Sequence, residues 1–359
     1  MSTSVDQQAP AAAAGERSAP SQSRTLMLVV GSGRSGTSLF TGIMHRLGFH
    51  VPQPEVTADL TNPRGFAEPK WVVDFHDALL GRAGVQVADA RPSAWAQTAK
   101  VAIDDDVRRR LREWLAAEFA KNDHVVIKDP RLSWFLPLWS QCAEDVGASS
   151  KYATVLRHPA AVIESKQRSY GNWQGDVERT AGWVNQVLFT ERATRDGPRA
   201  FVKYQDLLDD WTGVTAHVSD VLDLAVVREA PAASIVKIHE FVDQSLSRSR
   251  SSWDDFEIPD NLRTLADEVW TLVAGLADQG ADEQAALEPL EAARVSYIQL
   301  YEDAEAIAQS SITAAARAPA TRSTTVRALS KVPRRYKRKI PKRWRATVSR
   351  ALSRSGLRA

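Results

Sequence analysis

The segment Thr25-Leu26-Met27-Leu28-Val29-Val30-Gly31-Ser32-Gly33-Arg34-Ser35-Gly36-Thr37-Ser38-Leu39 decides the fold of this chain. An apolar run of strand length meets a glycine-rich turn, and a helical pattern of apolar residues follows at once. Such a strand–loop–helix unit exposes backbone N–H groups and points the positive end of a helix dipole at one spot. The side chains of Arg34, Ser35, Thr37 and Ser38 add donors there. The sequence therefore predicts a site for a phosphate or a similar oxyanion.

The spacing of the loop separates it from two better-known phosphate sites. Gly31 and Gly36 have the spacing of Gly-x-x-x-x-Gly-Lys-[Ser/Thr], but Thr37 stands where a P-loop NTPase has the lysine that binds the terminal phosphates. Three glycines also satisfy Gly-x-Gly-x-x-Gly, the dinucleotide fingerprint, which requires an acidic residue at the end of a second strand. Glu55 is near that distance, but two prolines flank it and no strand pattern precedes it. Both alternatives are therefore disfavoured.

The loop resembles the one with which sulfotransferases hold the 5′-phosphosulfate of 3′-phosphoadenosine 5′-phosphosulfate (PAPS). The resemblance implies that PAPS is the co-substrate and that no metal takes part. It also implies a set of donor-binding residues in the loop, namely Gly33, Arg34, Ser35, Gly36, Thr37 and Ser38.

A second candidate segment is Asn62-Pro63-Arg64-Gly65-Phe66-Ala67-Glu68, which leads into a helix that Pro69 is expected to open. A carboxylate at that position can cap the helix, or it can act as a general base toward an acceptor hydroxyl. The segment resembles the one that carries the catalytic glutamate in many bacterial sulfotransferases, which favours Glu68 as the base. Arg64 is a candidate for acceptor binding. The other possible bases, which lack a comparable setting, are His45, His50 and His76.

The third segment is a short buried strand, residues 124–128, followed by Asp129-Pro130-Arg131. Ligands of open parallel sheets bind beyond the carboxyl ends of the strands, where Lys128 and Arg131 lie. Either residue can instead form an ion pair, for example with Asp129. Lys-x-Pro resembles the sulfotransferase position whose lysine neutralises charge on the transferring group, so Lys128 is expected to be catalytic with Arg34. Arg131 is expected to face the acceptor.

A strand over residues 152–156 ends at Arg157, and a helix opened by Pro159 is expected to run to about Ser169. Arg157 and Ser165 then resemble the 3′-phosphate site of PAPS enzymes. The chemistry agrees, because a guanidinium offers paired donors to phosphate oxygens and a hydroxyl adds one more. Farther on, Tyr204-Gln205-Asp206-Leu207 resembles the family's Tyr-Glu-Asp-Leu signature, with structural roles expected for Tyr204 and Asp206.

Length and composition set the architecture. A chain of 359 residues with 43% apolar residues can bury one substantial core. We expect a three-layer α/β/α P-loop-like fold with a mostly parallel central sheet and extra C-terminal helices over residues 231–246, 262–276 and 289–308. The predicted divisions are a disordered leader (1–24), a sulfotransferase domain (25–312) and a basic tail (313–359). Arg248 and Arg250 are candidates for a loop over the nucleotide.

The charge distribution predicts partners and location. Residues 321–359 contain 14 Lys and Arg and no acidic residue, so the rest of the chain has a net charge of −12. Basic residues interspersed with Tyr336, Ile340 and Trp344 suit an anionic membrane surface, with a nucleic-acid arm or a solubilising tail as alternatives. A single cysteine, Cys142, excludes an internal disulfide and favours a reducing compartment. A cytoplasmic location is expected, peripheral on the inner membrane face, with no specific nucleic-acid partner.

The predicted reaction is transfer of a sulfuryl group from PAPS to a hydroxyl, or to an amine, of a carbohydrate, glycolipid or small-molecule acceptor. Two alternatives remain open on the sequence. One is a P-loop-type nucleotide kinase or NTPase with a degenerate loop. The other is a non-catalytic nucleotide-binding adaptor that its tail holds at a membrane.

Overall fold

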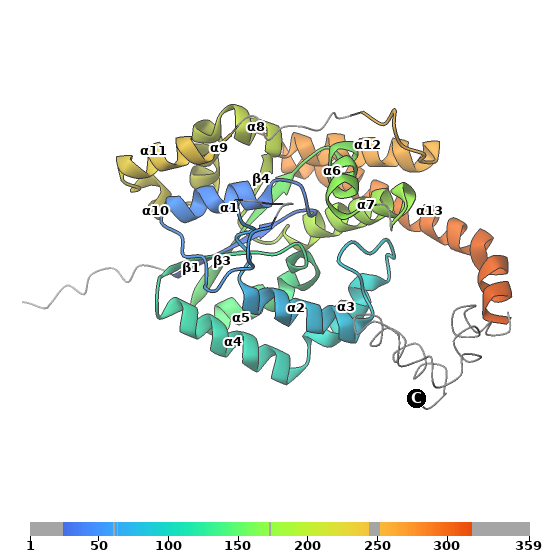
Figure 1. Ribbon diagram of the computed structural model, residues 1–359, viewed down its shortest axis with the longest axis horizontal. Coiled ribbons are helices and arrows are strands. Elements are labelled where there is room, and N and C mark those ends of the chain that lie inside the picture. The colour runs from blue at the N-terminus through green and yellow to red at the C-terminus, as the bar shows by residue number, and fades with distance from the viewer. Residues whose placement is uncertain (1–23, 60–61, 63, 172–173, 244–251, 318–359) are drawn as a thin grey trace, which may run out of the picture. The chain divides into compact units, whose positions relative to one another are not determined.

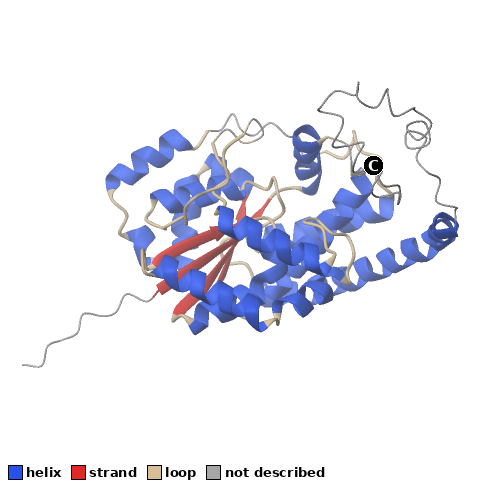
Figure 2. Ribbon diagram, turned by 60° about the horizontal axis from the view of Figure 1, so that its bottom comes forward, coloured by secondary structure: helices blue, strands red, loops and turns tan. Residues whose placement is uncertain are grey.

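A sheet of four parallel strands forms the centre of the protein (Figures 1 and 2). The computed structural model describes residues 24–59, 62, 64–171, 174–243 and 252–317. Across the sheet the strands are β2 (His124–Lys128), β1 (Arg24–Val30), β3 (Ala148–Leu156) and β4 (Arg199–Lys203). All the carboxyl ends therefore lie along one edge of the sheet.

The strands are apolar along most of their length because helices cover both faces of the sheet. In β1, Leu26 and Leu28 pack in one core cluster and Met27 and Val29 in another, so alternate side chains point to opposite faces. All four are fully buried. This arrangement confirms the prediction of three layers around a parallel sheet.

Figure 2 shows helices packed around the strands of the sheet. The helices of the two outer layers come from separate parts of the chain. The first core cluster packs against α2 (Lys70–Ala83), α3 (Ala94–Ala102), α4 (Asp105–Phe119), the 3-10 helix η1 (Leu132–Phe135) and α5 (Leu136–Asp145). The second packs against α1 (Thr37–Arg46), α8 (Tyr204–Asp209), α9 (Trp211–Val221), α10 (Ala225–Arg228) and α11 (Ala232–Phe241).

A third cluster joins the later helices to the sheet. It contains apolar side chains of α6 (Pro159–Tyr170), α7 (Asp176–Ala193), α12 (Asp260–Gly275) and α13 (Glu283–Arg317). Trp183 of α7, Val269 of α12 and Tyr297 of α13 are all buried in it. Of these, α12 and α13 correspond to the extra C-terminal helices predicted over residues 262–276 and 289–308.

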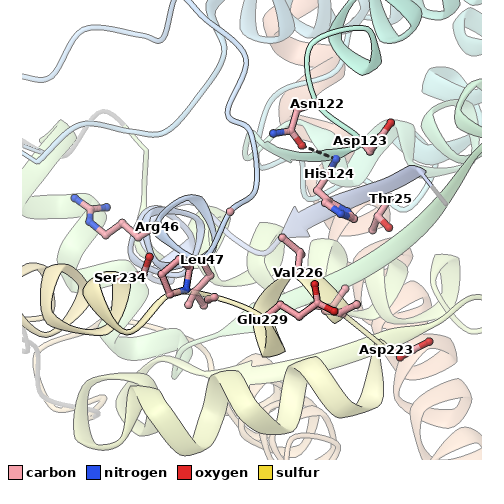
Figure 3. A pocket seen from close by; sticks show the side chains of 15 residues that line it. Thr25, Arg46, Leu47, Asn122, Asp123, His124, Asp223, Val226, Glu229 and Ser234 are labelled. Carbon is pink, nitrogen blue, oxygen red and sulfur yellow. Dashed lines mark hydrogen bonds between the residues drawn. The ribbon is translucent and has the colours of Figure 1, made fainter. Parts of the chain in front are cut away.

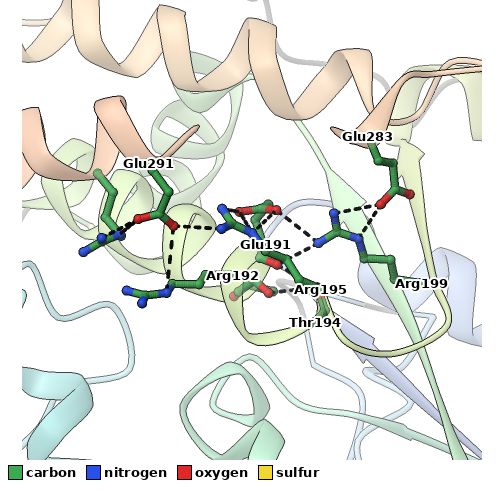
Figure 4. A network of polar contacts seen from close by, with 9 residues as sticks. Glu191, Arg192, Thr194, Arg195, Arg199, Glu283 and Glu291 are labelled. Atoms are coloured by element: carbon green, nitrogen blue, oxygen red, sulfur yellow. Dashed lines mark hydrogen bonds and ion pairs between the residues drawn. The ribbon is translucent and has the colours of Figure 1, made fainter. Parts of the chain in front are cut away.

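Figure 4 shows an ion-pair network that fastens the start of α13 to α7 and β4. The buried carboxylate of Glu191 pairs with Arg195 at 2.5 Å and with Arg199 at 3.1 Å. Each arginine also reaches α13, Arg195 through Glu291 and Arg199 through Glu283, both at 2.8 Å. Because Arg199 begins β4, this network lies at the opposite end of that strand from the carboxyl edge.

The prediction that the last helix begins at residue 289 is wrong, because α13 begins at Glu283 and continues through Pro289. The side chain of Asp282 accepts a hydrogen bond from the backbone N–H of Ala285 at 3.0 Å, so an acidic cap starts the helix earlier. β3 also begins earlier than predicted, since residues from Ala148 onward already pair with β1.

Several predictions fall outside the described residues. They concern most of the leader, the basic tail beyond Arg317, and the two arginines Arg248 and Arg250. The chain divides into one compact unit that ends at Tyr301, inside α13, and a second unit from Glu302 onward. Among the helices that the structure describes, none has the length and apolar character needed to cross a membrane.

Candidate functional site

The candidate site lies at the carboxyl edge of the sheet, where β1, β2 and β3 end. From β1 the chain goes to β2 on one side and later returns to β3 on the other. Open parallel sheets bind ligands where connections diverge in this way. The predicted phosphate loop, which comprises residues 31–38 and so includes the first two residues of α1, follows β1. Lys128 ends β2, and Arg157 follows β3.

The loop between β1 and α1 has a backbone that only glycine adopts easily at two positions. Gly31 has φ +144° and Gly36 has φ +95°. A Cβ on Gly31 would lie 2.4 Å from the carbonyl oxygen of Val155, and one on Gly36 would lie 2.1 Å from a ring carbon of Tyr204. The loop is therefore pressed against β3 on one side and against the Tyr204 ring on the other.

Replacing Gly36 with Ala is expected to disrupt the loop for two reasons. The position requires a positive φ, which alanine adopts only with strain, and the added methyl collides with the buried ring of Tyr204. We expect a loss of about 2–4 kcal/mol in the free energy of unfolding. Chemical denaturation measures it. Gly65→Ala is the matched control, since Gly65 has φ +86° but open space around its Cβ position. Equal losses in the two variants would mean that contact with Tyr204 is unimportant.

The residues that follow β3 meet this loop. The guanidinium Nε of Arg34 donates to Ser165 Oγ at 3.1 Å, and Arg157 Nη1 donates to the backbone oxygen of Arg34 at 3.1 Å. The Arg157 guanidinium also lies over the Tyr204 ring, 4.6 Å from its centroid. Burial lowers the pKa of Arg157, and Arg168 and Arg34 lower it further. The two predicted anion-binding groups thus form one continuous basic surface.

A buried ion pair lies beside this surface. Lys128 Nζ contacts Glu68 Oε1 at 2.5 Å and also donates to Ser38 Oγ and to the Phe66 carbonyl oxygen, both at 3.2 Å. Burial raises the pKa of Glu68, the charge of Lys128 opposes the rise, and the nearby carboxylate of Asp129 adds to it. The lysine therefore links the predicted base to the last residue of the phosphate loop.

Glu68 is held by its own loop and does not cap α2. The helix begins at Lys70 with Pro69 as its N-cap, and no side chain caps it. The Glu68 carbonyl oxygen accepts a hydrogen bond from the backbone N–H of Val56 at 2.8 Å. Asn62 closes the turn before it, donating to the Gly65 carbonyl oxygen at 2.6 Å and to Ser38 Oγ at 3.4 Å. The structure therefore contradicts the interpretation of Glu68 as a helix cap.

Behind Lys128 a fully buried hydrogen-bonded chain fixes the end of β2. Trp139 donates its indole N–H to His76 Nε2 at 2.8 Å, so the other ring nitrogen must carry the proton and donate to Asp129 at 2.7 Å. Burial alone would raise the pKa of Asp129, but His76 and Arg131 lower it overall. His76 is thus a buried positioning group and lies behind the site.

The two arginines predicted to face the acceptor are both engaged by carboxylates. Arg131 pairs with Asp129 at 2.8 Å and with Asp77 at 2.5 Å. Arg64 pairs with Asp243 at 2.9 Å, beyond the end of α11, and also donates to the Phe241 carbonyl oxygen. Neither arginine forms a hydrogen bond with the loop residues 31–38 among the contacts of the described chain.

Sequence reasoning missed three groups of this site. They are Asn62, which closes the Glu68 turn, the Tyr204 ring, for which only a general packing role was expected, and Lys166, whose Nζ donates to Ser32 Oγ at 3.0 Å. Lys166 follows Ser165 and lies one turn after the buried Val162, so a lysine on the buried face of a helix was the available signal. Within the described chain no cluster of His, Cys, Asp and Glu side chains could hold a metal ion.

A cavity of about 760 Å³ lies at the other edge of the sheet, where β1 and β2 begin (Figure 3). Its charged lining includes Asp123, Asp223 and Glu229, which would repel a phosphate. Arg46 is the lining residue that carries a fixed positive charge. The charge of this cavity therefore disfavours it as an anion site.

Comparison with solved structures finds two sulfotransferase domains among the similar proteins. The sulfotransferase domain from the curacin biosynthetic pathway has a TM-score of 0.41 and 16% sequence identity, covering 70% of this chain and 98% of that domain. The sulfotransferase domain from the Synechococcus PCC 7002 olefin synthase has a TM-score of 0.37 and 17% identity, covering 76% of this chain and 96% of that domain. No protein-family model matches the chain, and a search of curated proteins finds no match.

Proposed function

We propose that the protein transfers a sulfuryl group from PAPS to a hydroxyl group of an acceptor. The observation that carries this proposal is the meeting of Arg157 and Ser165 with the loop at Arg34. A loop that binds only one phosphate would need no second basic group, whereas PAPS has anionic groups at both its 5′ and its 3′ positions. The Arg157 guanidinium and the Ser165 hydroxyl are suited to the 3′-phosphate.

In the proposed complex the loop and the helix dipole of α1 bind the 5′-phosphosulfate. The residues assigned to this contact are Gly33, Arg34, Ser35, Gly36, Thr37 and Ser38. Lys128 reaches Ser38 Oγ already, so its ammonium is positioned at the reacting end of the loop. Thr37 at the P-loop lysine position favours this donor over a nucleoside triphosphate, whose terminal phosphate would lack its usual lysine.

The reaction requires one proton transfer and one exchange of bonds at sulfur. Glu68 accepts the proton of the acceptor hydroxyl as its oxygen forms a bond to sulfur. The bond between sulfur and the bridging oxygen breaks, and adenosine 3′,5′-bisphosphate leaves with that electron pair. Lys128 and Arg34 stabilise the negative charge that develops on the bridging oxygen.

The Glu68–Lys128 pair couples these steps. In the free protein the ammonium is held at 2.5 Å from the carboxylate and lowers its basicity. When the ammonium turns toward the anionic donor, it stabilises the Glu68 carboxylate less, so the pKa of Glu68 rises further. Glu68 then becomes a stronger base only when the donor is present.

We propose a carbohydrate or glycolipid as the acceptor, presented at the cytoplasmic face of an anionic membrane. The support is the concentration of positive charge in residues 321–359, which would bring the enzyme to such a surface. Vesicle sedimentation of the full chain, with and without anionic lipid, tests the membrane part of this proposal.

The test of the reaction is incubation of the purified protein with radiolabelled PAPS and fractionated cell extract. Transfer of label to an acceptor fraction is expected, with release of adenosine 3′,5′-bisphosphate. Tight binding of Mg²⁺–ATP without binding of the bisphosphate would overturn the proposal and favour a nucleotide kinase or NTPase. Binding of the bisphosphate that survives loss of both Glu68 and Lys128, with unchanged cellular function, would favour an adaptor.

A further inference from the structure

Lys166 of α6 is a buried cation directly behind the phosphate loop. Its side chain extends toward the loop and donates to Ser32 Oγ at 3.0 Å, and both residues are buried. Ser32 lies between Gly31 and Gly33, so the ammonium contacts the first turn of the loop and not the outer end where Ser38 meets Lys128.

This ammonium has no acidic partner among the described residues. Lys166 forms no ion pair in that part of the chain, and neither does Arg179 of α7, its strongest charged neighbour. Arg179 is 2% exposed; its Nη2 atom donates to the Gly171 carbonyl oxygen, and its Nη1 atom has no hydrogen-bond partner within the described chain. Buried cations are normally paired. Lys166 and Arg179 are two neighbouring buried cations without a carboxylate partner in the residues that the structure describes. This arrangement indicates that a bound ligand supplies the negative charge.

We propose that Lys166 is a positioning residue that places a positive charge beneath the loop, supplying from α6 the charge that Thr37 does not supply, and so strengthens binding of the donor's phosphate. This inference rests on the proposed function for the identity of the anion. Lys166 acts through Ser32 and through its charge, and not as a group that touches the reacting atoms.

Burial lowers the pKa of Lys166 to about 8, and the positive charge of Arg179 adds to the lowering. An anion bound in the loop favours the ammonium form and raises this pKa, so binding near pH 8 takes up protons. Three other cations lie near the loop, namely Arg34 in the loop itself, Arg157 after β3 and Arg179 of α7. All three are guanidinium groups, which keep their charge at this pH.

The sign of the pH dependence follows from this shift. Below pH 8 the ammonium is present before and after binding, and its full contribution is available. As the pH rises above the pKa of Lys166 in the free protein, the amine must take up a proton from solution when the anion binds, so the affinity falls. If the bound anion raises the pKa of Lys166 back toward an ordinary lysine value by one unit or more, the lysine strengthens binding by about tenfold or more at pH 7.

The experiment is calorimetric titration of the full chain with adenosine 3′,5′-bisphosphate between pH 7 and 9.5, in buffers of different ionisation enthalpy. Wild type is expected to take up protons and to lose affinity above pH 8. Lys166→Met is expected to bind about tenfold or more weakly at pH 7, with little proton uptake and a flat pH profile. Lys121→Met, which removes an exposed lysine before β2, is the matched control and should behave as wild type.

Thermal unfolding of the free proteins separates this role from a structural one. Removing a buried cation that lacks a counter-charge is expected to leave the melting temperature of Lys166→Met unchanged or higher. A variant that melts lower and binds with the wild-type pH profile would overturn the proposal, as would one with unchanged affinity. If wild type binds pyrophosphate with proton uptake that depends on Lys166, but does not bind the bisphosphate, the proposed function fails and the role of Lys166 stands.

Discussion

Replacing Glu68 with Gln is expected to lower the rate of sulfuryl transfer by about 10²–10⁴-fold, because the amide cannot accept the hydroxyl proton. Affinity for adenosine 3′,5′-bisphosphate should not fall, since Glu68 is assigned no contact with the nucleotide and its neutralisation leaves the Lys128 ammonium free to turn toward the anion. In wild type the rate should fall as the pH drops through the pKa of Glu68, which burial raises above the ordinary value. This acidic limb should be absent from the variant. Steady-state rates across pH measure the loss of activity and the acidic limb, and calorimetric titration measures the affinity for the bisphosphate.

Two controls separate chemistry from folding in this prediction. Glu55→Gln changes a carboxylate of the same loop region that hydrogen-bonds to Gln53, so its rate should remain near that of wild type. Glu68→Gln leaves the ammonium of Lys128 buried without a charge partner, which can cost about 3–5 kcal/mol of stability. The double variant Glu68→Gln with Lys128→Met restores neutrality and should regain stability without regaining activity. Full activity in a folded Glu68→Gln protein would disprove the base assignment.

Replacing Arg157 with Met is expected to abolish the preference for adenosine 3′,5′-bisphosphate over adenosine 5′-monophosphate. Hydrogen bonds to charged groups contribute about 1.5–3 kcal/mol each, so the bisphosphate should bind at least about tenfold more weakly. The monophosphate lacks the 3′-phosphate and should bind about as it does to wild type. Competition titrations with both nucleotides measure this selectivity.

Arg168→Met is the matched control for that experiment. Arg168 lies on α6, is half exposed and pairs with Glu164 at 3.6 Å, so its loss removes a nearby positive charge without removing a proposed phosphate ligand. Selectivity should therefore persist in Arg168→Met. Equal weakening of both nucleotides in Arg157→Met would instead mean that Arg157 holds the loop through the Arg34 carbonyl oxygen and does not read the 3′-phosphate.

The identity of several main elements could be predicted because it depends on neighbours in sequence. Residues 25–39 specify a buried strand, a glycine turn and a helix through apolar periodicity and through positive φ at Gly36. The same reasoning placed Lys128 and Arg157 at strand ends and predicted three layers around a parallel sheet. The start of α13 was predicted wrongly because Pro289 is a strong local signal, whereas the cap at Asp282 is a weak one.

Which groups come into contact depended on the tertiary structure. The order β2-β1-β3-β4 puts β1 between the strands that carry Lys128 and Arg157, so both reach the one loop. Nothing local to Glu68 specifies Lys128 as its partner, and nothing local to Lys166 specifies Ser32. The sequence alone determined where the cations stand along the chain. Only the folded sheet determined their partners, because contacts across strands depend on strand order and burial and not on spacing along the chain.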